Sequence, residues 1–167
     1  MSTNTSDLPT ENNLSIISIM TKELNFEIKL SSAPSALGVA RQMDAFYQIG
    51  RKKYPSLQRN EHHTAEVFDP MGALIAGAYF IKFQELLSIE SFWVEDVHQG
   101  LKIGQKLYDA IEAFARTAQC EYIVGTVPSY YSGALEFWKK QGGSVFGEIN
   151  LAGSGNKILY VRKNIRS

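Results

Sequence analysis

One segment constrains the fold more than any other, because it joins a strand pattern to the clearest helix pattern in the chain. Residues 86–94 form an apolar-rich strand that ends in Phe-Trp-Val, and residues 95–100, Glu-Asp-Val-His-Gln-Gly, have the composition of a turn. From Ile103 to Ala118, apolar residues recur at three- and four-residue steps, as on a helix with one buried face. A strand, a glycine-bearing loop and an amphipathic helix therefore follow one another directly.

The rest of the chain supplies further strands and two more helices. Strands are expected at residues 26–30, 63–68, 73–83, 122–127, 144–149 and 157–163, and helices at about 33–50 and 134–141. The order is strand, helix, three strands, long helix, strand, helix, two strands. It predicts an α/β (α+β) fold in which helices pack on a mixed, mostly antiparallel sheet.

Length and composition limit the alternatives. A chain of 167 residues with 44% hydrophobic content suits one domain, which we place at residues 23–167, after a Ser/Thr/Asn-rich tail at 1–22 that we expect to be disordered or weakly ordered. The net charge of zero gives no general attraction to nucleic acid or anionic membrane. The longest apolar run, residues 73–81, is far shorter than the ~20 residues of a membrane span. We expect a cytoplasmic protein.

The loop before the long helix has the features of a phosphate site. The first N–H groups of a helix lack backbone partners and lie at the positive end of its dipole. Gly100 and Gly104 would let a pyrophosphate approach the backbone. Lys102 and Lys106 occupy turns that a bare helix would give to acids, although two solvated surface lysines explain the same pattern equally well.

Other motifs are weaker. The chain has no Gly-Lys-Ser/Thr phosphate loop and no strand–GxGxxG–helix dinucleotide fingerprint. His62 and His63, with Glu61 and Glu66, fit no compact metal site, so no metal is expected. Cys120 is the one cysteine and is expected to be a buried hydrophobe.

The run from Gln99 to Gly104 resembles the pyrophosphate loop of the GNAT N-acetyltransferase superfamily, with Lys102 in place of the middle glycine. Residues 134–142, Ala-Leu-Glu-Phe-Trp-Lys-Lys-Gln-Gly, resemble the family's following helix, and the resemblance covers nearly all of the chain after the tail. It implies a three-layer fold with helices on both faces of the sheet, and acetyl-CoA as cofactor. The residues that it assigns to cofactor binding are Trp93, Val94, Gln99, Gly100, Leu101, Lys102, Ile103, Gly104, Gln105, Lys106, Tyr131 and Trp138.

The resemblance also implies direct attack of an amine on the acyl thioester, with the backbone N–H of Val94 polarising the acyl carbonyl. An alkylammonium must first lose a proton. Glu90 is the candidate base, because even spacing in a strand puts its side chain on the face of Val94; an exposed strand glutamate is an equal alternative. Asp96 and Glu85 are weaker candidates.

The departing thiolate needs a proton donor, for which many family members use a tyrosine in the helix after the fifth core strand. Trp138 stands at that position here, and an indole cannot serve as the acid. Tyr131, or Tyr130 beside it, could reach the same region, although each also suits a packing or substrate-lining role. Trp138 is most simply a core aromatic.

These observations leave more than one function open. The leading hypothesis is an enzyme that moves an acetyl group from acetyl-CoA to a primary amine of a small molecule or peptide. The alternative is an acyl-CoA-binding module without turnover, acting as a sensor. A partner-binding role for the tail and a homodimer also stay open.

Overall fold

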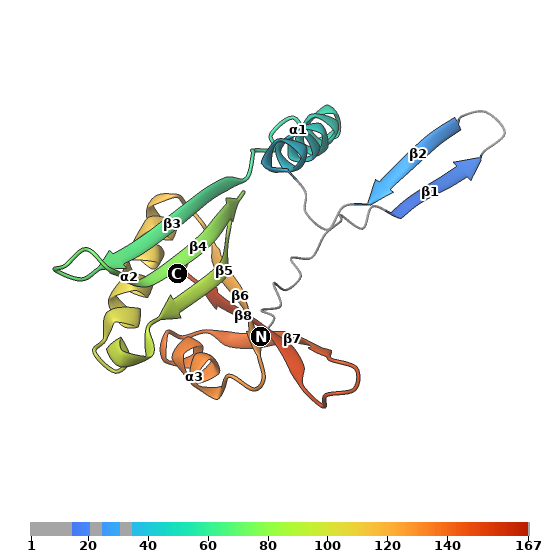
Figure 1. The fold of residues 1–167 in the computed structure, drawn as a ribbon. Helices are drawn as coiled ribbons and strands as arrows, with labels where there is room; N and C mark the ends of the chain where they lie inside the picture. Colours follow the sequence, from blue (N-terminus) through green and yellow to red (C-terminus); the bar gives the residue numbers. More distant parts are fainter. Residues whose placement is uncertain (1–14, 21–24, 31–34, 167) are drawn as a thin grey trace, which may run out of the picture. The chain divides into compact units, whose positions relative to one another are not determined.

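The structure, a computed structural model, describes residues 15–20, 25–30 and 35–166 and divides the chain into two units, residues 1–56 and 57–167. In the first unit, strands β1 (Ser15–Met20) and β2 (Asn25–Leu30) pair antiparallel, and helix α1 runs over Ala36–Lys53 (Figure 1). The side chain of Ser35 caps α1 by accepting from the Gly38 N–H at 3.0 Å.

Strand β1 is not among the expected strands, because residues 15–20 fall within the tail expected to be disordered or weakly ordered. Residues 1–14 of that tail lie outside the described residues. Strand β2 matches the strand expected at 26–30, and α1 continues three residues beyond the expected end at Gly50. None of the helices in the described ranges has the length and apolarity that crossing a membrane requires.

The second unit is built on a six-stranded sheet of order β3-β4-β5-β6-β8-β7 (Figure 1). All neighbouring strands are antiparallel except β5 and β6, which are parallel, so the expected mixed, mostly antiparallel α/β fold is confirmed. The strands are β3 (Glu61–Phe68), β4 (Leu74–Phe83), β5 (Leu86–Val94), β6 (Tyr122–Pro128), β7 (Ser144–Asn150) and β8 (Lys157–Asn164). The helices are the short 3-10 turn η1 (Asp96–His98), α2 (Ile103–Thr117) and α3 (Ser132–Lys140).

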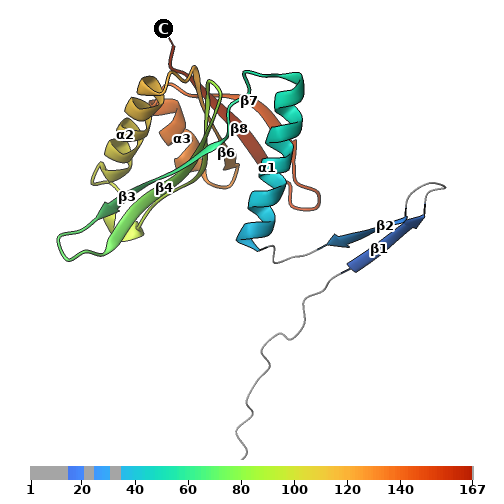
Figure 2. The ribbon, with the colours of Figure 1, turned by 90° about the horizontal axis from the view of Figure 1, so that it is seen from above.

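The core of this unit lies between one face of the sheet and helices α2 and α3, which lie on the same side of it (Figure 2). Tyr108 of α2 makes edge contacts with the rings of Phe137 and Trp138 of α3, at centroid distances of 5.7 and 5.9 Å. The sheet residues that face this core alternate along each strand, as the pleat requires. They include Ala76, Ala78, Phe80, Leu87, Ile89, Ile123, Val127, Leu159 and Val161.

Trp138 belongs to this core, with 8% of its surface exposed. Its ring lies on the backbone of Gly125, where an added Cβ would come within 2.8 Å of Cζ2. Gly143 is equally constrained, since its Cβ would lie 3.0 Å from the Trp138 ring and backbone oxygen. Two interpretations of Trp138 were open from the sequence, a cofactor contact and a core aromatic. In the structure its side chain is part of the core.

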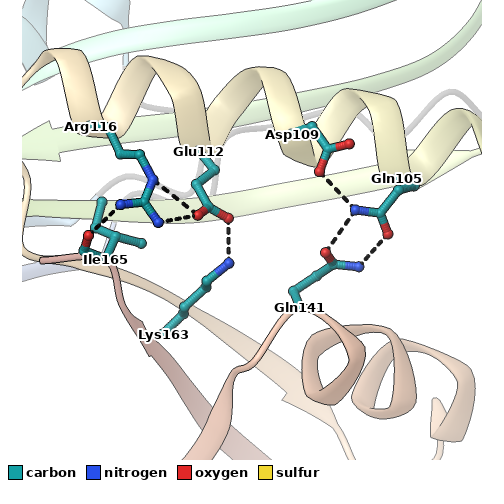
Figure 3. Close-up of polar contacts among 7 residues, drawn as sticks. All are labelled: Gln105, Asp109, Glu112, Arg116, Gln141, Lys163 and Ile165. Carbon is teal, nitrogen blue, oxygen red and sulfur yellow. Dashed lines mark hydrogen bonds and ion pairs between the residues drawn. The ribbon is translucent and has the colours of Figure 1, made fainter. Parts of the chain in front are cut away.

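Polar contacts fix the C-terminal half of α2 (Figure 3). Glu112 accepts hydrogen bonds from Lys163 of β8 and from Arg116, and Arg116 also donates to the carbonyl of Ile165 at 2.6 Å. Burial alone would raise the pKa of Glu112, but the bonds from Lys163 and Arg116 outweigh it and lower that pKa. Glu112 is therefore ionised in the folded protein and ties α2 to β8.

The contact between Trp138 and Gly125 makes a first prediction. Gly125→Ala should lower the free energy of unfolding by about 1–3 kcal/mol, because the new methyl group overlaps a ring in a packed core. The matched control is Gly133→Ala in α3, where an added Cβ meets nothing within 4 Å and should be neutral or stabilise by up to about 1 kcal/mol. Urea unfolding of both variants measures the difference; equal effects would contradict the packing described here.

Candidate active site

The site begins where β5 and β6 separate. Their parallel pairing runs from Leu86–Tyr122 to Ile89–Gly125 and ends there, although β5 continues to Val94 and β6 to Pro128. On its other edge β5 stays paired with β4 as far as Val94. Within the described part of the chain, the edge of β5 beyond Ile89 therefore borders a gap in the sheet and has no strand partner.

The backbone N–H of Val94 points into this gap. The next residue, Glu95, donates its N–H to the carbonyl of Ile75 in β4 at 3.0 Å. Because successive residues of a strand direct their amide groups to opposite edges, the N–H and C=O of Val94 face away from β4. The Val94 carbonyl accepts from Nε2 of Gln99 at 3.1 Å, which leaves the N–H as the group open to a ligand.

Gln99, which is part of the predicted phosphate loop, also holds that loop against the end of β5 through its side chain. Its Nε2 donates both to the Val94 carbonyl and to Oδ1 of Asp96, at 2.8 Å. These two bonds fold the loop containing η1 back onto the end of β5. No sequence pattern predicts these two hydrogen bonds of Gln99, because they depend on where the loop turns.

The start of α2 offers unpaired amides. The first helical bond runs from the N–H of Lys106 to the carbonyl of Lys102 at 3.1 Å, so the N–H groups of the three residues between them, Ile103, Gly104 and Gln105, have no intrahelical acceptor. Lys102 is the N-cap residue and supplies no capping acceptor, and the first turn contains no acid. This arrangement favours a bound anion.

The loop before α2 is open and conformationally demanding. Gly100 has φ of 80°, and Lys102 has φ of 63°, a left-handed conformation that suits glycine better than lysine. Gly100, Leu101, Lys102 and Lys106 are exposed, whereas Gly104 is packed against the end of β5, its would-be Cβ 3.4 Å from Cγ2 of Val94. The left-handed Lys102 stands where the resembling family has its middle glycine.

The side chains of two residues predicted to bind the cofactor point away from the unpaired amides of α2. Gln105 points to α3, where its amide bonds to Gln141. Trp93 lies on the face of the sheet opposite α2, with Nε1 3.2 Å from the position of a Cβ on Gly77 and 40% of its surface exposed. The backbone of both residues stays at the site, while their side chains do not face the unpaired amides.

The expectation that Glu90 shares a face with Val94 is wrong. The register of β4 and β5 shifts at this point: Tyr79 pairs with Ser91 and Phe80 with Ile89, so Glu90 is an extra, bulged residue. Its carboxylate accepts from the hydroxyl of Ser88 at 2.6 Å, on the face away from α2. Val94 contacts Gly104 of α2 on the other face. Glu90 is exposed beside the gap, on the face of the six-stranded sheet away from α2, which we call the open face.

The other acid and base candidates are separated by position. Glu85 lies in the turn before β5, at the end of the strand opposite Val94. The carboxylate of Asp96 accepts a hydrogen bond from Gln99. Tyr130 and Tyr131 follow the end of β6, which lies at the same edge of the sheet as the end of β5 because these strands are parallel. Both residues are more than half exposed, and their ring centroids lie 4.6 Å apart.

The histidines and the cysteine have other roles. His62 bonds to the hydroxyl of Tyr79 at 2.6 Å, and His63 stacks on Phe80. No group of three metal-ligating side chains was found among the described residues. Burial raises the pKa of the Cys120 thiol, which fits its place in the core.

The left-handed conformation of Lys102 makes a second prediction. Lys102→Gly should raise the free energy of unfolding by about 1 kcal/mol, because a Cβ at this φ costs roughly that much. Lys106→Gly removes the same charge inside the helix and should instead lower it by about 1 kcal/mol. Urea unfolding compares the two variants, and a destabilised Lys102→Gly would show that the loop does not require this conformation.

Comparisons with known proteins agree with this geometry. A family model described as "Acetyltransferase (GNAT) family" matches residues 30–143. Solved structures with the same fold include an acetyltransferase from Bacillus cereus (19% identity, TM-score 0.65, 80% of this chain and 95% of the other) and a putative acetyltransferase from Agrobacterium tumefaciens (17%, 0.69, 81% and 96%). An aminoglycoside 6′-N-acetyltransferase solved with coenzyme A is 14% identical, with TM-score 0.57 over 81% and 97% of the two chains.

A search of curated protein sequences gave no match for this chain. The family match covers more than half of its residues, and the loop from Gln99 to Gly104, the start of α2 and the gap beside Val94 all lie within the matched range. The chain belongs to the GNAT acetyltransferase family.

Proposed function

We propose that this protein transfers an acyl group, acetyl first among them, from acyl-coenzyme A to a primary amine of a small molecule or peptide by direct attack. The observation that carries the proposal is the position of two sets of free backbone N–H groups at one edge of the sheet. Val94 directs its N–H into the gap between β5 and β6, and the first turn of α2 packs on Val94 through Gly104. Coenzyme A in a related fold supports the cofactor class.

The start of α2 and the unpaired edge of β5 offer groups that suit the parts of an acyl-coenzyme A molecule. The amides of residues 103–105, with Lys102 and Lys106, would hold the pyrophosphate, since they combine free donors, a helix dipole and positive charge. The unpaired edge of β5 would hold the amide-containing pantetheine arm, because backbone groups at a strand edge need partners. The bound cofactor supplies an acyl thioester, whose carbonyl carbon is electrophilic.

Val94 and Glu90 would act from different directions. The Val94 N–H donates to the acyl oxygen as negative charge develops on it, which favours the transition state over the ground state. Its side-chain face is irrelevant to this role. Glu90, on the open face, would take the proton from an incoming ammonium group. The amine would therefore approach from the open face, and the phosphates would lie on the side of α2.

A proton donor for the leaving thiolate would come from the start of α3. Trp138 is buried and carries no usable proton, so it is not that donor. Tyr131 is exposed, and its N–H bonds to the Pro128 carbonyl at 2.9 Å, which places it directly after β6 at the mouth of the gap. We assign the role to Tyr131, with Tyr130 as the neighbouring alternative.

The core position of Trp138 also favours a second candidate function. If no tyrosine takes over proton donation, the protein binds acyl-CoA without efficient turnover and acts as a sensor. Binding with no release of coenzyme A above hydrolysis across a broad panel of amines supports this second function. Transfer to any amine in the panel excludes it.

Cofactor binding is tested first by thermal unfolding with saturating acetyl-CoA. Ligand at a hundred times its dissociation constant stabilises the native state by about 2.7 kcal/mol, which should raise the midpoint by roughly 5–10 °C. The double variant Lys102→Glu/Lys106→Glu should lose most of this shift, because both charges lie beside the proposed phosphate site. Absence of any shift in the wild type at millimolar ligand would refute the proposed function.

The role of Glu90 is tested by Glu90→Gln, which keeps the size of the side chain and an acceptor for Ser88. Loss of a general base should lower kcat by about 10²–10⁴-fold near pH 7. The decrease should shrink at alkaline pH, where the free amine no longer needs a base. Glu85→Gln, at the far end of β5, is the matched control and should retain activity. Unchanged kcat in Glu90→Gln would reduce Glu90 to an exposed strand residue.

A further inference from the structure

Two glutamine side chains join the first turn of α2 to the end of α3 (Figure 3). Nε2 of Gln105 donates to Oε1 of Gln141 at 2.8 Å, and Nε2 of Gln141 donates back to Oε1 of Gln105 at 2.6 Å. The remaining Nε2 proton of Gln105 goes to Oδ1 of Asp109 at 2.7 Å. Both amide protons of Gln105 are therefore used within the protein, and its side chain is not free to bind a phosphate.

The partner in α3 is held firmly. Gln141 is 8% exposed and is the C-cap residue of α3, where its own N–H bonds to the carbonyls of Phe137 and Trp138 at 3.1 Å. Gly142 follows in a left-handed conformation with φ of 81°, which ends the helix. The backbone of Gln141 is thus fixed, and its side-chain amide forms hydrogen bonds that tie the start of α2 to the end of α3.

The N-terminus of α2 lacks a side-chain cap that would fix its orientation. Its N-cap residue, Lys102, offers no side-chain acceptor, and a helix end without a cap frays. Gly104 packs on Phe92, Val94 and Phe137, but apolar contacts fix a distance better than a rotation. The two hydrogen bonds of the amide pair are directional, so they fix the rotation of the first turn of α2 about the helix axis.

We propose that Gln105 and Gln141 are positioning residues for the cofactor. Their amide pair holds the first turn of α2 in the rotation at which the free N–H groups of residues 103–105 converge on one anion. This inference rests on the proposed function, because it assumes that the pyrophosphate binds at that turn. Neither side chain contacts the cofactor, and the effect passes through the helix backbone.

The test uses Gln105→Met, Gln141→Met and the double variant, because methionine is close to glutamine in size but cannot form the pair. Arg116→Met is the matched control, since it removes a contact of α2 at its other end. For each protein, dissociation constants are measured by calorimetry for coenzyme A and by NMR titration for pantetheine, which lacks the pyrophosphate. Urea unfolding of the same proteins records stability.

Each single variant should weaken coenzyme A binding by roughly tenfold, the loss expected for one impaired hydrogen bond to a charged oxygen. Pantetheine binding should stay within about twofold, because that ligand does not reach α2. The double variant should recover stability, since two apolar partners replace two polar ones, yet keep the weakened coenzyme A binding. Arg116→Met should lose stability and keep its affinity.

Four results would overturn the inference. Coenzyme A affinity that recovers together with stability in the double variant makes the pair purely structural. Equal losses for coenzyme A and pantetheine place the effect outside the phosphate turn. A wild-type protein that binds neither ligand removes the proposed function and this inference with it, whereas a wild type that binds coenzyme A with unchanged variants removes the inference alone.

Discussion

The separation of β5 from β6 after four residue pairs is the constraint on which the site depends. Beyond Ile89 and Gly125 each strand keeps its outer partner, β4 or β8, so neither can close the gap without breaking an established ladder. Trp138 lies on Gly125 at the last pair, and Glu90 bulges from β5 immediately after it. Unpaired backbone groups in such a gap require another hydrogen-bond partner, and a ligand with amide groups can supply it.

Helix α2 is fixed at both ends by different kinds of contact. Near its C-terminus, Glu112 is paired with Lys163 and Arg116, and this link needs an ionised carboxylate. Near its N-terminus the contact is a neutral amide pair, which brings no charge close to the proposed phosphates. Between them, the ring of Tyr108 packs on α3. An acidic side chain at the N-terminal contact would have opposed the same anion that the helix start favours.

The order of elements from β2 to β8 was predictable because each carries its own periodic pattern, and several of the connections between them contain glycine, proline or asparagine. The position of the loop from Gln99 to Gly104 before α2 was predictable for the same reason. Strand β1 was missed, since its short Ser-Ile-Ile-Ser-Ile-Met run follows a polar segment that reads as a tail. The use of Gln99 and Gln141 was missed because amide side chains give no signal about their partners until the chain is folded.

The face of Glu90 shows most clearly where reasoning from spacing fails. Alternation along a strand holds only while the ladder is regular, and a single bulged residue reverses every side-chain face that follows it. Here the bulge at Glu90 keeps Phe92 and Val94 on the side of α2 and leaves the carboxylate on the open side. The reversal suits the proposed chemistry better than the expected arrangement. A base on the side of α2 would share that space with the cofactor phosphates, whereas a base on the open face meets an amine that arrives from the other side of the sheet, with the Val94 N–H at the edge between them.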